Sequence, residues 1–154
     1  MQGNEQLAVI IPKLRSLAAA IGGDQLENPT PCTEFSVAGV LDHMTGLAST
    51  FAPMFRGEPP PEPTEVVTDP GDTQAFDVAM KTLLDAVESP GALERTVTTP
   101  AGTMPGAVFA RLVALDGLIH GWDLAVSTDQ EWDLPADLVA EVDDFARQAI
   151  TTEM

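Results

Sequence analysis

Apolar residues recur at steps of three and four along five stretches of this 154-residue chain. That spacing places side chains on one face of an α-helix, so each stretch predicts an amphipathic helix. Apolar and polar residues never alternate for long, and residues 97–99 (VTT) predict at most a short extended piece. The apolar positions are Leu7, Ile10, Leu14, Leu17 and Ile21; Val37, Val40, Met44, Leu47 and Phe51; Phe76, Met80, Leu83 and Val87; Val108, Leu112, Leu115, Ile119, Trp122 and Val126; and Leu138, Val142, Phe145 and Ala149.

Residues that start and stop helices flank these stretches. Ser36 is a candidate N-cap for the second stretch, and Asp72 precedes the third. Pro105 and Pro135 stand just before the last two, where proline suits the first turn of a helix. The sequence therefore predicts an all-α fold, a four-helix bundle with a short fifth helical element, in one domain over residues 1–154.

The predicted connections are long for a simple bundle. Residues 22–36, 56–72 and 89–104 each exceed the ~2–8 residues that usually join helices in a bundle. Residues 58–63 (EPPPEP) predict an extended, semi-rigid crossover because proline favours the polyproline conformation. Such loops indicate either a crossover topology or walls around a site at one end of the helices.

The charge of the chain excludes several kinds of partner. With 24 acidic residues against 7 Lys and Arg, the formal net charge is −17, which argues against nucleic acid and anionic membranes. No stretch is long and apolar enough to span a membrane, and the N-terminus lacks the pattern of a signal peptide. The one cysteine, Cys32, allows no internal disulfide, so we expect a cytoplasmic protein.

The fourth stretch places chemically active residues on one side of a helix. Asp116 and His120 are four residues apart, and Asp123 follows one turn later. His43, the other histidine, lies beside the apolar face of the second stretch, so facing helices would bring it to Asp116 and His120. Two imidazoles and one carboxylate leave coordination positions open, which is typical of a catalytic metal site.

These residues also allow plainer interpretations. An Asp-x-x-x-His pair often forms only an ion pair on a helix surface, and a histidine beside an apolar face is often half-buried without a ligand. Trp122 is placed either in the core or in a substrate pocket, and Cys32 either in the structure of its loop or as a reactive thiol. Gly117 and Gly121 would allow a neighbouring helix to approach closely or leave room beside the ligands.

Four segments resemble hallmark segments of the DinB-like superfamily: residues 29–35 (PTPCTEF), 41–48 (LDHMTGLA), 90–106 (PGALERTVTTPAGTMPG) and 119–125 (IHGWDLA). Within it, the chain is most similar to the metal-binding N-terminal domain of mycothiol-dependent maleylpyruvate isomerases. The resemblance implies a four-helix bundle that binds a divalent metal, commonly zinc, through His43, Asp116 and His120.

The resemblance also shapes the expected function. The resemblance implies a Glu at the position of Asp116, because that is the acidic residue of the isomerase branch. The second domain of full-length isomerases has no counterpart in this sequence. We therefore expect a thiol-dependent transferase or isomerase that acts on a small electrophile, with Zn²⁺ favoured over Ni²⁺, Fe²⁺ or Mn²⁺ and Asp123 orienting a ligand. One alternative is a non-enzymatic module that acts as a homodimer and binds a metal or a small ligand. Another is a metal-dependent hydrolase, in which the same ligands would activate water.

Overall fold

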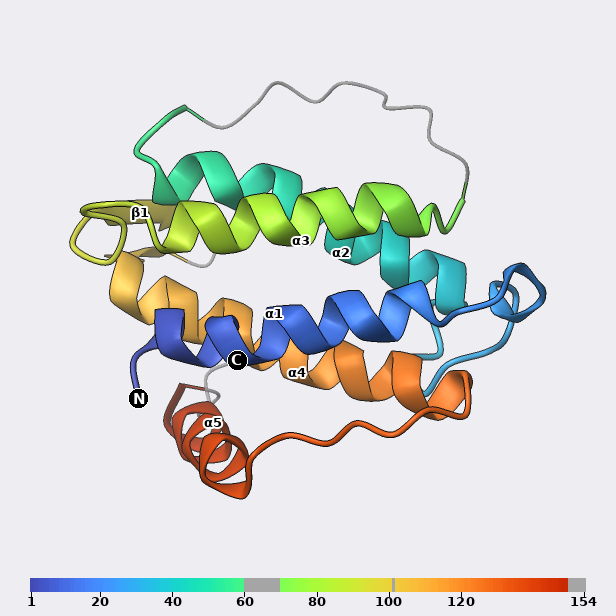
Figure 1. Cartoon of the computed structure of the whole chain (residues 1–154). Coiled ribbons are helices and arrows are strands. Elements are labelled where there is room, and N and C mark those ends of the chain that lie inside the picture. Colours follow the sequence, from blue (N-terminus) through green and yellow to red (C-terminus); the bar gives the residue numbers. More distant parts are fainter. Residues whose placement is uncertain (60–69, 101, 150–154) are drawn as a thin grey trace.

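The computed structural model describes residues 1–59, 70–100 and 102–149, and this part of the chain is mostly helical (Figure 1). The extended crossover expected over residues 58–63 lies outside the described residues, except for its first two positions. The helices are α1 (Gly3–Ala19), the short 3₁₀ helix η1 (Gly23–Gln25), α2 (Val37–Phe55), α3 (Thr73–Val87), α4 (Gly106–Ser127) and α5 (Ala136–Ala149). Each of the five predicted helical stretches is thereby confirmed.

Helix starts follow the signals in the sequence. The Ser36 hydroxyl accepts a hydrogen bond from the Gly39 backbone N–H at 3.2 Å and so caps α2. The Asp72 carboxylate accepts bonds from the Gln74 and Ala75 backbone N–H groups at 3.0 and 3.1 Å and caps α3. Pro105 immediately precedes α4. These caps confirm the predicted starts of the second, third and fourth helices.

A β-hairpin corrects the prediction of a purely α-helical fold. Strands β1 (Thr96–Thr99) and β2 (Gly102–Pro105) pair antiparallel, with Thr96 opposite Pro105 and Thr99 opposite Gly102. Gly102 has a φ of 125°, which side-chain-bearing residues rarely adopt, and this suits it to the turn. Strands of four residues contain too little alternation for the sequence pattern to separate them from a loop.

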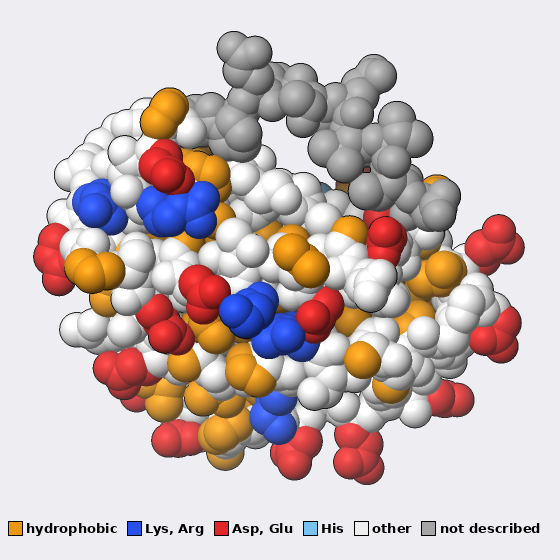
Figure 2. All heavy atoms as spheres, turned by 45° about the horizontal axis from the view of Figure 1, so that its top comes forward, with side chains coloured by type: hydrophobic (Ala, Val, Ile, Leu, Met, Phe, Trp, Pro, Cys, Tyr) orange, Lys and Arg blue, Asp and Glu red, His pale blue; other side chains and the backbone are white. Residues whose placement is uncertain are grey.

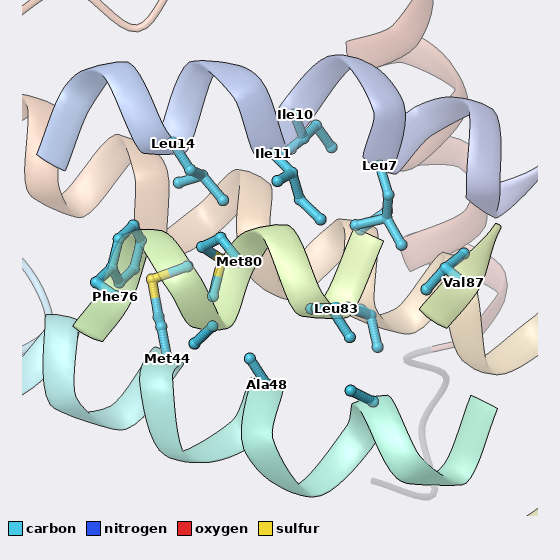
Figure 3. Close-up of a cluster of buried hydrophobic side chains, with 14 of the residues drawn as sticks. Leu7, Ile10, Ile11, Leu14, Met44, Ala48, Phe76, Met80, Leu83 and Val87 are labelled. Carbon is cyan, nitrogen blue, oxygen red and sulfur yellow. The ribbon is translucent and has the colours of Figure 1, made fainter. Parts of the chain in front are cut away.

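The helices pack around a shared apolar core. Helix α1 contacts α4 and α3, and α2 contacts α3 and α4, so α2 and α3 lie above α1 and α4 in Figure 1. Side chains of α1 such as Leu7 and Leu14 point toward Met80 and Leu83 of α3 (Figure 3). Helix α5 packs against α4, where the Arg111 guanidinium lies 4.5 Å from the ring centre of Phe145.

Helix α4 buries a different face from the one its large apolar residues predict. Four residues of the predicted core row are 38–51% exposed: Val108, Ile119, Trp122 and Val126. The buried side instead contains small residues, among them Ala110, Ala114, Gly117 and Gly121. The prediction of a buried row was wrong because α4 is apolar on nearly every side, so periodicity alone could not select the buried face. We call Val108, Leu112, Leu115, Ile119, Trp122 and Val126 the outer row.

Acidic side chains dominate the charged surface. Figure 2 shows them spread over the face that it presents, with fewer basic groups between them. Arg15 of α1 forms an ion pair with Asp77 of α3 at 2.7 Å, which links the two helices at the surface. Among the described helices, none combines the length and the apolar character that crossing a membrane requires.

Candidate metal centre

Helices α2 and α4 bring His43, Asp116 and His120 together. One possible ligand atom from each residue lies within 4.8 Å of the other two. The His120 Nε2 and Asp116 Oδ1 atoms are 3.3 Å apart, and the ring centroids of His43 and His120 are 5.3 Å apart. Two ligands at ~2.1 Å from one tetrahedral ion lie roughly 3.4 Å apart, so this spacing suits a shared cation.

The His120 imidazole contacts a carboxylate at each of its two nitrogens. Its Nδ1 lies 3.2 Å from Asp123 Oδ2, one helical turn after the contact between Nε2 and Asp116. Asp123 is only 4% exposed, so its carboxylate is a fixed partner inside the protein. With Nδ1–H donating to Asp123, the Nε2 lone pair faces the side of Asp116 and His43, as a metal-ligating histidine requires.

These carboxylates raise the pKa of His120 above its ordinary value of 6.5. The hydrogen bond with Asp116 is the largest cause, burial opposes it, and Asp123 adds to the increase. In the metal-free protein, the protonated ring therefore stabilises the fold fully below pH ~6.5, and this stability is lost as the pH rises through the raised pKa. A bound cation would take the place of the proton on Nε2, beside Asp116, while Nδ1–H would stay with Asp123.

Phe35 is a neighbour of the site that the sequence analysis missed. Its ring stacks on the His43 imidazole with centroids 5.1 Å apart and planes inclined by 26°. The turn before α2 holds Phe35 in place, because the Phe35 N–H donates to the Cys32 carbonyl at 2.9 Å and the Thr30 hydroxyl donates to the Phe35 carbonyl at 2.7 Å. Residues 29–35, singled out for their family resemblance, thus form the turn beside the candidate ligands. Cys32 is a half-buried free thiol in this turn.

The other residues highlighted by the sequence lie around the site in different ways. Trp122 is 49% exposed in the outer row, and its role in a substrate pocket stays a prediction. Gly121 lies against the indole of Trp132, whose N–H donates to the Leu118 carbonyl at 3.1 Å, so a loop and not a helix approaches it. Gly117 faces Ile10 and Leu14 of α1, where an added Cβ would lie 3.3 Å from Ile10 Cγ2.

Replacing Asp123 with asparagine is expected to weaken binding of a divalent metal by about 10–100-fold, because the His120 ring loses the charged partner of its Nδ1–H. Competition of the purified protein with a chromophoric chelator measures the affinity. Asp129→Asn, beyond the end of α4, is the matched control because it removes the same charge from an exposed position. Equal affinities of the two variants would contradict an orienting role for Asp123.

Fold and site together define a mostly helical protein with a candidate divalent-metal centre of two imidazoles and a carboxylate. The family described as the mycothiol maleylpyruvate isomerase N-terminal domain matches residues 7–125. The chain belongs to this family, which is DinB-like. The matched region contains the residues of the candidate centre and Asp123.

The chain is also similar to two curated relatives. Two curated sequences of an uncharacterized protein from Mycobacterium tuberculosis, one from strain CDC 1551 and one from strain H37Rv, are each 33% identical over 128 residues. The match covers 82% of this chain and 67% of each relative. No solved structure matches the sequence significantly.

Proposed function

We propose that this protein is a divalent-metal-binding transferase or isomerase that uses a low-molecular-weight thiol to act on a small electrophilic substrate. The convergence of His43, Asp116 and His120 in a member of the mycothiol-related family carries the proposal. The two imidazoles and the carboxylate would hold the ion, and Zn²⁺ suits this set of ligands best. Helices α1–α4 would then form the four-helix bundle expected of a DinB-like protein.

The residues around the candidate centre are suited to this chemistry. A bound divalent metal would keep a thiol in its thiolate form at neutral pH and present the sulfur to an electrophile. The Asp116 side chain is 39% exposed and that of His120 is 13% exposed, so solutes reach the centre from the side of Asp116. Asp123 holds the His120 ring, and Phe35 covers one face of the His43 ring. The proposal also places the protein in the cytoplasm, where thiols are kept reduced.

A turnover assay tests the proposed function. Protein loaded with Zn²⁺ is mixed with an electrophile such as monobromobimane and with mycothiol, cysteine or glutathione, and conjugate formation is followed by fluorescence. We expect turnover above the uncatalysed rate with at least one thiol, and its loss in the metal-free protein and in His43→Ala. Hydrolysis of ester or amide substrates without any thiol would support the metal hydrolase instead. Tight metal binding without turnover of either kind would support the non-enzymatic binding module.

A homodimer stays a prediction, and the outer row of α4 is the surface that we propose for it. Two copies of a chain with net charge −17 repel each other unless the facing surfaces lack acidic groups, and every residue of the outer row is apolar. Val126→Glu is expected to shift a dimer toward monomer in sedimentation velocity. Val78→Glu, at an exposed position of α3, should leave the sedimentation coefficient unchanged. A wild-type monomer at all protein concentrations would contradict the dimer.

A further inference from the structure

An apolar cavity lies among the four packed helices, next to the candidate metal centre. Its volume is about 20 Å³, in the measure in which one water molecule needs about 10–15 Å³. The lining residues come from α1, α2, α3 and α4, and Asp116 is the one polar side chain among them. They are Leu7, Ile11, Leu14, Met44, Leu47, Ala48, Phe51, Met80, Leu83, Val113, Asp116 and Gly117.

Asp116 connects this cavity to the candidate centre. Its carboxylate belongs to the group of possible ligands with His43 and His120, and the residue also forms part of the cavity wall. On α2, Met44 directly follows His43 in sequence and lines the same cavity. A molecule held at the centre therefore has an apolar space within reach. Figure 3 shows Met44 and Ala48 of α2 pointing toward Met80 of α3 and the side chains of α1.

The side chains around the cavity can make room for more than a water molecule. Met44 and Met80 are unbranched, and methionine adapts its shape more easily than other apolar residues. Leu47 is only partly buried, so its side chain can move outward without opening the core. Gly117 adds no side chain to the wall beside Asp116.

The chemistry of the wall selects what can enter. Among the described residues that line the cavity there is no basic side chain that could pair with an anionic group. A charged or strongly polar group would also lose its hydration there without finding a partner. An alkyl or similar hydrocarbon group instead gains about fourfold in affinity for each methylene that is buried.

We infer that the cavity holds a short hydrocarbon portion of the substrate, so that the electrophile or the thiol conjugate acted on at the centre has an apolar tail. This inference rests on the proposed function for the identity of the substrate. The existence of the apolar subsite can be tested without metal or catalysis. Failure of the subsite can therefore be distinguished from failure of the proposed function.

Alkanethiols from ethanethiol to hexanethiol are the probes. In metal-free protein labelled with ¹³C at the methionine methyl groups, we expect these thiols to shift the Met44 and Met80 signals, with Met54 as an internal control outside the lining. Affinity should rise about fourfold per methylene until the space is filled. In protein loaded with Co²⁺, the thiolate-to-metal absorption band should report the same dependence on chain length.

Two variants of half-buried leucines refine the test. Leu47→Ala enlarges the rim of the cavity. The alkanethiol that binds most tightly, which defines the best chain length, should therefore become longer by one or two methylenes. Leu84→Ala on α3 removes the same atoms from a half-buried leucine outside the cavity and should leave the best length unchanged. Because both side chains are partly exposed, both variants are expected to fold, which circular dichroism checks.

Each outcome decides something. Shifts at Met44 and Met80 that grow with chain length support the subsite, even when the Co²⁺ band is absent and the proposed metal chemistry fails. A Co²⁺ thiolate band whose affinity does not depend on chain length, with both methionine signals unmoved, overturns the subsite and leaves the proposed function intact. Equal effects of Leu47→Ala and Leu84→Ala on the best chain length also overturn it.

Discussion

Protein purified without added metal and without a nickel column is expected to contain close to one divalent ion per chain, and alanine at His43 or His120 should remove nearly all of it. Each substitution deletes one of three proposed ligands from the centre. The loss in affinity should exceed the about 10–100-fold effect of removing a partner that only orients a ligand. Elemental analysis after gel filtration measures the metal content.

The controls for this experiment separate loss of a ligand from loss of the fold. Asp133→Ala removes an exposed acidic residue that lies six residues beyond the end of α4 and outside the group of proposed ligands, and it should retain full metal. His120→Ala also removes the contacts with Asp116 and Asp123, so circular dichroism and the unfolding midpoint must show that the variant is folded. Full metal content in both folded histidine variants would rule out the proposed centre.

Local sequence signals predicted the helix starts well, because the start of a helix depends on a few residues that are close in sequence. Ser36 and Asp72 satisfy backbone N–H groups that the first turn of any helix leaves without a partner, so their effect does not require knowledge of the rest of the fold. The sequence predicted only a short extended piece where β1 and β2 form a hairpin. The pairing joins residues across a turn, and strands of four residues are too short to show a clear alternation of apolar and polar residues.

The face of α4 could not be predicted by the same reasoning. Periodicity assumes that large apolar residues are buried, whereas α4 packs closely on α1 through small residues. Gly3 of α1 lies against Ala110, and an added Cβ there would be 2.6 Å from the Ala110 Cβ. Close helix approach is a property of the pair of helices, and a single sequence segment does not reveal it.

The candidate site was predicted in part. The i, i+4 spacing placed Asp116 beside His120, and the structure shows that contact at 3.3 Å. The approach of His43 from α2 depends on how two helices pack, so its spacing indicated this contact only on the condition that the helices face each other, and the family resemblance indicated the same residue. Phe35 and the cavity beside Asp116 were missed, because both depend on which side chains meet in three dimensions.

The spacing of α2 and α4 at the candidate centre depends on an aromatic cluster further along both helices. The Phe109 ring lies 4.9 Å from that of Phe51 and 5.2 Å from that of Phe55, centroid to centroid. Phe109 and Asp116 are seven residues apart and therefore lie on the same side of α4, two turns from each other. The same pair of helices thus meets at the phenylalanines and at the two histidines.

Phe109→Ala is expected to lower the free energy of unfolding of the metal-free protein by about 3–5 kcal/mol, because Phe109 is 5% exposed and its removal leaves a cavity between α2 and α4. Urea denaturation measures the loss. Val78→Ala, at a position of α3 that is 63% exposed, should change the stability by no more than about 0.5 kcal/mol.

A metal that bridges α2 and α4 should restore part of this lost stability. At a free metal concentration of 100 times Kd, binding to the folded state adds about 2.7 kcal/mol. That recovery should occur in Phe109→Ala and disappear when His43→Ala is added, because the ion then has no ligand on α2. If His43 were only structural, His43→Ala would lower the free energy of unfolding both with and without metal, and the metal would still stabilise the double variant. Equal recovery in the single and double variants would therefore place the bound metal elsewhere.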